Sequence, residues 1–209
     1  MKNKHPDYIA GWKTIEDWKH VSEQLNAGAN AEFWQSVAEE FFLARLNLRY
    51  LDPIQILQEN GTFQGEGFSI VAIQCTLLEF LESTVQGLEY RFLRGGEVLG
   101  PYEYSSSSNL FVNFLTSRIP FSSEFNTNLA HDFYIGVRCG LLHEARTKNG
   151  WRIWAKDSAD RMVNSGDRIV FRDNFQAALL KFISAYIAEL PYNLEYQKAF
   201  IRKFDSLCK

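Results

Sequence analysis

Several features that would define a function directly are scarce or missing. The chain of 209 residues has three cysteines, Cys75, Cys139 and Cys208, and contains neither a CxxC nor an HExxH motif. An odd number of scattered cysteines predicts reduced thiols rather than a disulfide framework. The missing motifs exclude the common structural zinc and zincin sites. We therefore expect no metal and no cofactor.

Long apolar runs are missing as well. The N-terminal stretch MKNKHPDYIAGW has no apolar segment of the kind found in signal peptides. The longest apolar stretch, FSIVAIQCTLLEFL, is interrupted by Gln74 and is shorter than the roughly 18 residues that a membrane span needs. The sequence predicts a cytoplasmic protein without a membrane partner.

What the chain does have is the composition of a globular protein. Hydrophobic residues make up 46% and charged residues 22%, and the 15% of aromatic residues predict a core rich in rings. The net charge of −3 argues against a protein that coats nucleic acid indiscriminately. Residues 144–181 nevertheless hold eight basic against five acidic side chains, which predicts either a mildly basic face or an ordinary solvated surface.

Helical periodicity dominates the chain and predicts the all-α class. Asn30 is a candidate N-cap for a long helix that ends before Pro53. The other helices are expected at 14–25, 68–88, 109–118, about 127–146, 173–190 and from 192 to the C-terminus. The stretches WRIWAKD, RMVN and RIVF, with turn residues at 164–167, predict a small β-hairpin inserted after the 127–146 helix. We expect one domain, with an N-terminal helical extension (1–60), a core (66–190) and a C-terminal helix (191–209).

The helix expected at 127–146 carries the unusual residues YIGVRCGLLHEAR. Glycine costs about 1 kcal/mol inside a helix, so Gly136 and Gly140 predict a close approach of another backbone, which we expect to be a helix across a two-fold axis. Arg138 and His143 interrupt the same apolar run, about 140° apart around an ideal helix. A two-fold partner could bring a second copy of both side chains into one cleft.

The segment FYIGVRCGLLHEA resembles the R-x4-6-H helix of the HEPN superfamily, many of whose members are metal-independent endoribonucleases. Residues 66–190 are the comparable region, and the resemblance implies a HEPN-like helical bundle. Two positions depart from the family pattern: Cys139 stands where a polar residue is usual, and Glu144 and Ala145 replace the tyrosine found in HEPN toxins paired with nucleotidyltransferases.

The resemblance implies a homodimer that cleaves single-stranded RNA with Arg138 and His143 as the catalytic residues. RNA supplies its own nucleophile, the 2′-OH. Imidazole can exchange a proton near neutral pH, and the arginine fork can bind phosphate and stabilise the charge of the transition state. A role in phage defence or growth arrest follows, although a cognate inhibitor or antitoxin is not identifiable from the sequence.

Other residues are candidates for supporting roles. Arg146, Lys148 and Arg152 follow the motif and are expected to bind RNA. Glu79 and His131 are candidate supporting residues. Glu79 and Glu82 share the polar face of the 68–88 helix, where they are either solvated or balance a buried cation.

Two further interpretations remain open. Cys139 and the acidic overall charge favour a non-catalytic HEPN-like module that binds RNA, a nucleotide or a protein partner. A helical scaffold in which the motif is a coincidence is the third interpretation.

Overall fold

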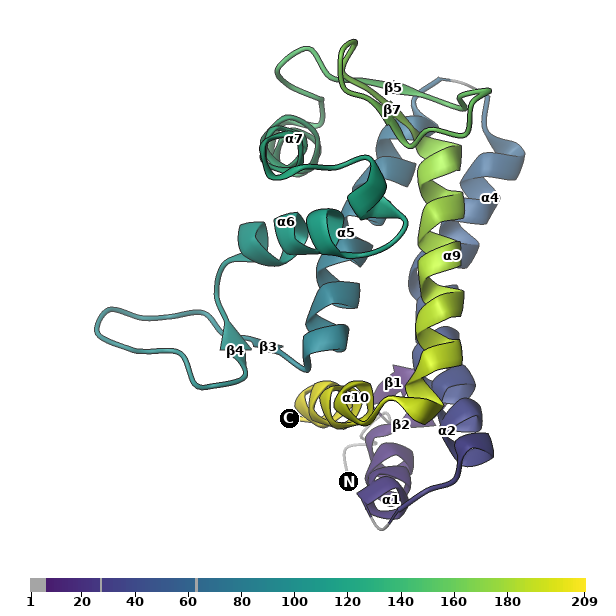
Figure 1. Ribbon diagram of the computed structural model, residues 1–209, viewed down its shortest axis with the longest axis vertical. Coiled ribbons are helices and arrows are strands. Elements are labelled where there is room, and N and C mark those ends of the chain that lie inside the picture. The colour runs from purple at the N-terminus through teal and green to yellow at the C-terminus, as the bar shows by residue number, and fades with distance from the viewer. Residues whose placement is uncertain (1–6, 27, 63) are drawn as a thin grey trace, which may run out of the picture. The chain divides into compact units, whose positions relative to one another are not determined.

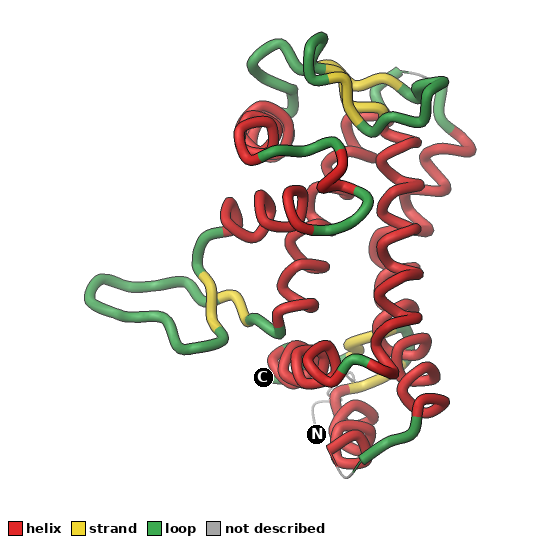
Figure 2. The backbone as a smooth tube through the Cα atoms, in the orientation of Figure 1, coloured by secondary structure: helices red, strands yellow, loops and turns green. Residues whose placement is uncertain are grey.

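The computed structural model describes residues 7–26, 28–62 and 64–209. Helices make up most of this part of the chain, and the strands are two or three residues long (Figures 1 and 2). The predicted all-α class is therefore confirmed. α5 (Glu66–Gln86) is long and apolar enough to cross a membrane, but 61% of its apolar window is buried inside the protein, as in the core helix of a soluble protein.

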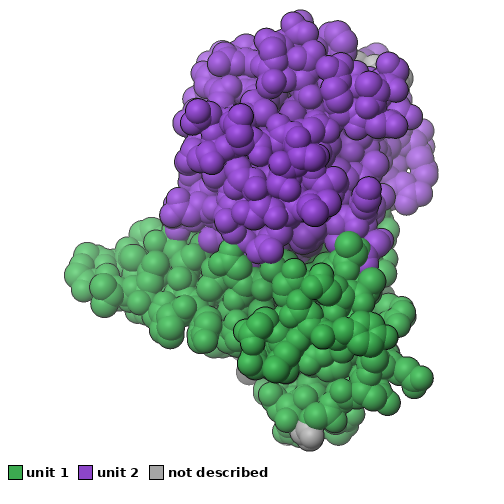
Figure 3. All heavy atoms as spheres, in the orientation of Figure 1, with its two compact units in different colours: residues 1–52, 83–105, 185–209 green, residues 53–82, 106–184 purple. Residues whose placement is uncertain are grey.

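The chain divides into two compact units that alternate along the sequence (Figure 3). Unit 1 comprises residues 1–52, 83–105 and 185–209, and unit 2 comprises 53–82 and 106–184. This division differs from the expected extension, core and C-terminal helix, because α5 and α9 (Arg172–Glu189) each contribute residues to both units. Three of the four boundaries fall within helices, namely α4 (Asp52–Asn60), α5 and α9, and the fourth, between residues 105 and 106, falls just before α6 (Ser107–Ser117).

Unit 1 is built around a cluster of aromatic rings. Its remaining elements are β1 (Tyr8–Ala10), β2 (Lys13–Thr14), α1 (Ile15–Asn26), α2 (Ala31–Val37), η1 (Ala38–Leu43), α3 (Ala44–Leu46), η2 (Asn47–Leu51), β3 (Glu89–Tyr90), β4 (Glu103–Tyr104), η5 (Leu190–Tyr192) and α10 (Leu194–Ser206). The ring of Trp18 lies 5.0 Å from that of Phe204 and 5.2 Å from that of Phe41, and its Nε1 donates a hydrogen bond of 2.8 Å to Asp205. The ring cluster thus joins α1, η1 and α10.

The helix that begins after Asn30 does not end before Pro53, so that prediction is wrong. Asn30 caps it as expected, accepting a hydrogen bond from the backbone N–H of Phe33. The helix continues through η2 into α4 (Asp52–Asn60). In η2 the N–H of Asp52 donates to the C=O of Asn47, five residues earlier. Such a widened turn makes room for the ring of Pro53, which would clash with the carbonyl four residues before it in a regular α-helix.

Unit 2 holds the motif segment and has its own aromatic core. Its further elements are α6 (Ser107–Ser117), η3 (Phe121–Ser123), α7 (Thr127–Phe133), η4 (Tyr134–Cys139), α8 (Gly140–Glu144), β5 (Arg152–Trp154), β6 (Val163–Asn164) and β7 (Ile169–Phe171). Phe133 of α7 stacks on Phe175 of α9 at 5.8 Å and meets the ring of Trp151 edge-on at 5.2 Å. These contacts fix α7 against α9 and against the segment that follows the motif.

The predicted β-hairpin is present as β6 and β7, which pair antiparallel. β5 adds a third strand parallel to β7, giving the order β5-β7-β6. The sheet lies at the N-terminal end of α9 (Figure 1). Residues 145–151, which connect the motif helix to β5, pack against that helix.

Candidate functional site

The motif segment is one continuous helix made of α7, η4 and α8. It starts at Thr127, as expected, and the side chain of Asn126 caps it by accepting a hydrogen bond of 2.9 Å from the N–H of Leu129. It ends at Glu144 rather than near Arg146, because Ala145 adopts a left-handed conformation with φ of 53°.

The middle of this helix is a π-helical segment, η4, which contains Arg138. π-turns are rare and frequently occur at functional sites. In an α-helix of 3.6 residues per turn, each residue lies about 40° further around the helix axis than the residue four positions before it. Residues spaced four apart therefore drift away from a common neighbour. A wider turn counteracts this rotation, so that residues four apart can keep facing the same neighbour.

Such a stripe exists and explains both glycines. A Cβ atom added to Gly136 would lie 2.4 Å from Cδ1 of Trp151, and one added to Gly140 would lie 2.5 Å from the backbone oxygen of Arg146. The N–H of Lys148 also donates a hydrogen bond of 2.7 Å to the C=O of Gly136. The backbone that approaches the glycines is thus the loop 145–151 of the same chain. The prediction that another helix packs on Gly136 and Gly140 is wrong, and these buried glycines give no support to a dimer contact.

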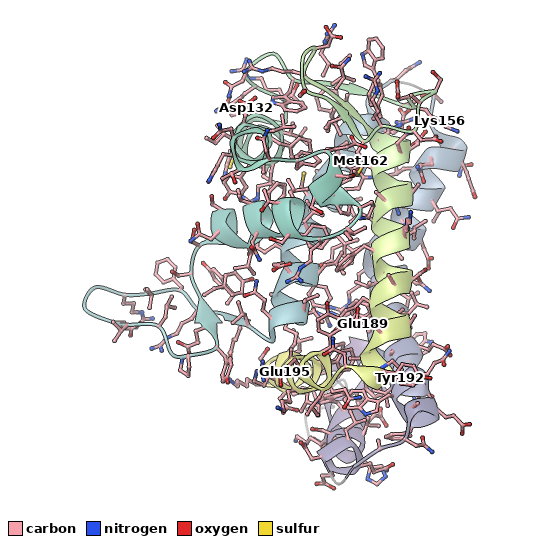
Figure 4. All side chains as sticks on the ribbon, viewed as in Figure 1. Asp132, Lys156, Met162, Glu189, Tyr192 and Glu195 are labelled. Carbon is pink, nitrogen blue, oxygen red and sulfur yellow. The ribbon has the colours of Figure 1, made fainter. Side chains whose placement is uncertain are left out.

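Two carboxylates extend the stripe at either end. Asp132, four residues before Gly136, accepts hydrogen bonds from Nε1 of Trp151 (3.1 Å) and Nδ2 of Asn149 (3.3 Å) and pairs with Arg168 (3.3 Å). Figure 4 shows Asp132 on the motif helix. The residues Asp132, Gly136, Gly140 and Glu144 therefore form one face, which we call the packed face.

Glu144, at the other end of the packed face, pairs with Lys148 and with Arg146 (3.1 Å). Hydrogen bonds from Lys148 and Arg146 hold the pKa of the Glu144 carboxyl below its usual value. Two of the three basic residues expected to bind RNA therefore have a carboxylate partner in the protein.

Arg138 points in a different direction, toward α5. Its guanidinium lies 3.6 Å from the carboxylate of Glu79 and 5.3 Å from the ring centroid of Tyr134, and 17% of its side chain is exposed. The hydroxyl of Tyr134 hydrogen-bonds with Ser107 of α6 at 3.1 Å. The structure therefore brings the candidate supporting residue Glu79 to Arg138. The sequence did not lead us to expect Tyr134 as a second contact of Arg138.

The guanidinium of Arg138 is held in position, but its N–H donors are not all engaged in hydrogen bonds. Among the described residues it makes no hydrogen bond, because the contact with Glu79 is longer than a normal one. An ion pair on one side and an aromatic face on the other hold the guanidinium in place while its N–H donors remain available. This arrangement can receive an additional anion.

Glu82, one turn beyond Glu79 on α5, is fully buried and has a purely structural environment. Nε and Nη2 of Arg118 each donate a hydrogen bond of 2.9 Å to its two oxygens. Each of these two glutamates thus pairs with a partly exposed arginine, Glu79 with Arg138 and Glu82 with Arg118.

Cys75, near Arg138, is not arranged as a nucleophile. Cys75 of α5 is fully buried, and burial raises the pKa of its thiol far above the ordinary range, although the nearby Arg138 opposes this shift. A thiol that stays protonated is a poor nucleophile. Cys139, next to Arg138, is partly exposed.

His143 lies in the last turn of the motif helix and is exposed, with no hydrogen-bond or ion-pair partner among the described residues. Its free imidazole can reach a molecule in solution but is not brought to Arg138 within this chain, in agreement with their expected separation around the helix. His131 is also exposed and makes no such contact in the described part of the chain. It does not support Arg138 or His143.

The segment after the helix forms a shallow hollow lined by residues 146–152. Arg152, unlike Arg146 and Lys148, has no carboxylate partner in the described ranges, and its Nη2 donates to the C=O of Asp167 at 3.0 Å. The three basic residues thus lie along one surface segment, but only Arg152 has a charge that is not already paired.

The sequence held a signal for two of the missed residues. Asp132 stands four residues before Gly136 and eight before Gly140, so it could have been assigned to the glycine face. Tyr134 could have been recognised as the partner of Arg138 four residues later. Trp154 of β5 is exposed, and only the structure reveals this.

No three His, Cys, Asp or Glu side chains gather as a candidate metal site in the described ranges. No family model matches the chain, and no curated protein or solved structure is significantly similar to it. The physical arrangement of Arg138, His143 and their neighbours therefore carries the functional interpretation.

Proposed function

We propose that this protein is a metal-independent endoribonuclease that cleaves single-stranded RNA by transesterification of the 2′-OH. The observation that carries the proposal is the guanidinium of Arg138, which Glu79 and Tyr134 orient while its N–H donors stay available. A preorganised guanidinium fork suits a phosphodiester. The free imidazole of His143 on the same helix supplies the proton-transfer group.

The reaction balances with these groups alone. The 2′-oxygen attacks the adjacent phosphorus while a neutral imidazole accepts the proton of the 2′-OH. The bond from phosphorus to the 5′-oxygen breaks, and an imidazolium donates a proton to that oxygen. Arg138 stabilises the negative charge of the transition state. The products are a 2′,3′-cyclic phosphate and a 5′-OH.

If one imidazole accepts the proton of the 2′-OH while another donates a proton to the 5′-oxygen, two imidazoles are needed. We therefore propose a homodimer in which the two copies of His143 lie in one cleft. The exposed face of the motif helix offers a contact for the second copy. Ile135 and Leu142 are 52% and 46% exposed, and seven residues separate them, which places them two turns apart on one side. We call this the exposed face, and His143 adjoins it. A dimer that uses this face replaces the contact first expected at Gly136 and Gly140.

The dimer can be tested independently of activity. Leu142→Glu would bury a charge in the contact and should convert a dimer to a monomer in light scattering at micromolar concentration. A wild-type protein that is monomeric under these conditions would contradict the shared cleft.

The resemblance to the HEPN superfamily agrees with this proposal and extends it to a cytoplasmic role in phage defence or growth arrest. A helical bundle of the HEPN type is part of the same proposal. The all-α class and the position of Arg138 and His143 on one helix of unit 2 support it.

Two observations favour the competing proposal of a non-catalytic binding module. Glu79 neutralises part of the charge that Arg138 would offer to phosphate, and the whole chain carries a net charge of −3. Such a module would bind RNA, a nucleotide or a protein partner without cleaving it.

Cleavage in a chelator separates the two proposals. We expect the protein to cut a single-stranded RNA in EDTA and to leave 2′,3′-cyclic phosphate ends. Arg138→Lys keeps the charge but loses the fork, so it should cleave at least tenfold more slowly. Activity that requires magnesium, or RNA that stays intact although it binds, would exclude the proposed enzyme.

A further inference from the structure

The strand that follows the motif helix exposes an aromatic ring between two cations. Arg152, Trp154 and Lys156 are exposed, whereas Ile153 and Ala155 between them are partly covered. Side chains along a strand alternate between its two faces, so Arg152 and Trp154 share one face of β5 (Arg152–Trp154), and the exposed Lys156 follows two residues after the strand ends. Figure 4 shows Lys156 just beyond β5.

Trp154 is placed to offer its ring to a ligand. It is 51% exposed, although tryptophan is usually well covered in folded proteins. Its ring meets that of Phe171 on β7 at 6.2 Å with the planes at 77°. The edge contact holds the indole in position and leaves apolar surface open to solvent.

The two cations beside this ring are not neutralised by the protein. The guanidinium of Arg152 lies 5.9 Å from the ring of Trp154. Neither Arg152 nor Lys156 forms an ion pair with a carboxylate in the described part of the chain. By contrast, Arg146, Arg161 and Arg168 are each paired with an acidic side chain. Unpaired positive charge is therefore concentrated around Trp154.

A cavity of about 140 Å³ adjoins Trp154. Its wall includes Phe68, which is itself exposed, and the ion pair between Glu66 and Arg172 (3.1 Å). Because these two charges neutralise each other, the cavity combines apolar surface with polar groups and little net charge. A neutral aromatic base fits this chemistry better than a phosphate does.

β5 is also connected rigidly to the motif helix. Trp151, which immediately precedes it, is 2% exposed and is held by Asp132 and against Gly136. A strand rises about 3.3 Å per residue, so Trp154 lies about 10 Å from Trp151 along the chain. The ring of Trp154 is therefore linked by a short piece of chain to the packed face of the motif helix.

We propose that Trp154, with Arg152 and Lys156 on either side, is a stacking platform for single-stranded RNA. A base stacks on the indole at the mouth of the cavity, and the two cations contact the flanking phosphates. Stacked aromatic rings beside a basic track are typical of proteins that bind single strands with little sequence preference. This proposal rests on the proposed ribonuclease function. It adds a binding site for the part of the RNA that extends beyond the motif helix.

Binding of a fluorescent RNA of twelve uridines tests the platform in the full chain carrying His143→Ala, which prevents cleavage. Trp154→Ala should weaken binding about 5- to 100-fold, the usual loss for one stacked base. Trp154→Tyr should restore most of the affinity because it keeps a ring. Trp12→Ala is the matched control, since Trp12 is an exposed tryptophan of unit 1, and it should bind like the parent.

Three outcomes would overturn the platform, and they are distinguishable. If Trp154→Ala binds the RNA like its parent while the wild type cleaves RNA, the platform is wrong and the ribonuclease stands. If the parent does not bind and the wild type does not cleave, both proposals fail. A twelve-residue RNA backbone without bases should bind equally to the parent and to Trp154→Ala, because it has nothing to stack. A loss of affinity for that probe would show that the substitution acts through the fold.

Discussion

The two faces of the motif helix differ in what their residues contact. On the packed face, Asp132, Gly136, Gly140 and Glu144 are occupied by the loop 145–151 of the same chain. Ile135 and Leu142 of the exposed face contact solvent, and the neighbouring His143 is exposed as well. Residues that look unusual in a helix can therefore serve packing alone, and the chemistry that the helix offers to another molecule has to be sought on the other face and at Arg138.

The largest effect on stability should come from filling the packed face. Gly140→Ala places a methyl group where backbone atoms of Arg146 lie 2.5 Å away. We expect the free energy of unfolding to fall by about 3 kcal/mol, as in overpacked cores. Denaturant unfolding measures this loss.

The control for Gly140→Ala is Leu180→Ala at an exposed position of α9, which lies outside the proposed dimer contact and should change stability by no more than about 0.5 kcal/mol. Equal effects of the two substitutions would mean that Gly140 is not packed as described.

A smaller loss should follow from Asp132→Ala. It removes the acceptor of the Trp151 indole N–H, which is buried, and an unpaired buried donor costs about 1–3 kcal/mol. A thermal melt should show the loss directly. His131→Ala changes the neighbouring exposed residue and should leave the melt unchanged. An unchanged melt for Asp132→Ala would refute the role of this carboxylate in holding the loop.

Much of this helix was predictable, and the reason is local. Thr127 as the start, the buried apolar positions and the need for space at Gly136 and Gly140 follow from periodicity and side-chain size. The sequence does not predict which segment fills the space beside Gly136 and Gly140, because a distant helix and a nearby loop would both require small residues there. The hydrogen bond from Lys148 to Gly136 distinguishes them, and it depends on the left-handed turn at Ala145, which the sequence does not signal with a glycine.

The fold showed the same limit. The sequence predicts Asn30 and its helix, yet it also predicts an end at Pro53, because a proline disrupts a regular α-helix. The π-turn before it could not be foreseen from residue propensities. Likewise the pairing of Glu79 with Arg138 joins residues far apart in sequence, and periodicity alone places each of them only on its own helix.

Substitution of Ala145, the residue that follows the packed face, should increase stability. Ala145 has φ of 53°, a conformation that glycine adopts without strain. Ala145→Gly should therefore raise the free energy of unfolding by about 0.5–1 kcal/mol. Ala177→Gly, at an exposed position inside α9, is the matched control and should lower it by about 1 kcal/mol. A loss of stability in Ala145→Gly would contradict the strained turn.

The smallest effect concerns the salt dependence of RNA binding. In the His143→Ala background, Arg152→Gln with Lys156→Gln should lower the slope of log affinity against log salt by about 1.4, or about 0.7 for each phosphate that the protein no longer neutralises. Arg146→Gln with Lys148→Gln should lower it less, because Glu144 of the packed face already holds both cations. Equal slopes for the two double variants would show that Glu144 does not withhold these cations from RNA.

The most direct test of the central claim compares two exposed histidines of the same helix. Single-turnover cleavage of a single-stranded RNA in EDTA should be about 10²–10⁴-fold slower for His143→Ala than for the wild type, since general acid–base catalysis contributes about that much. His131→Ala should cleave at the wild-type rate, and both variants should melt like the wild type. If His143→Ala cleaves as fast as His131→Ala, His143 does not transfer the proton and the proposed mechanism is wrong.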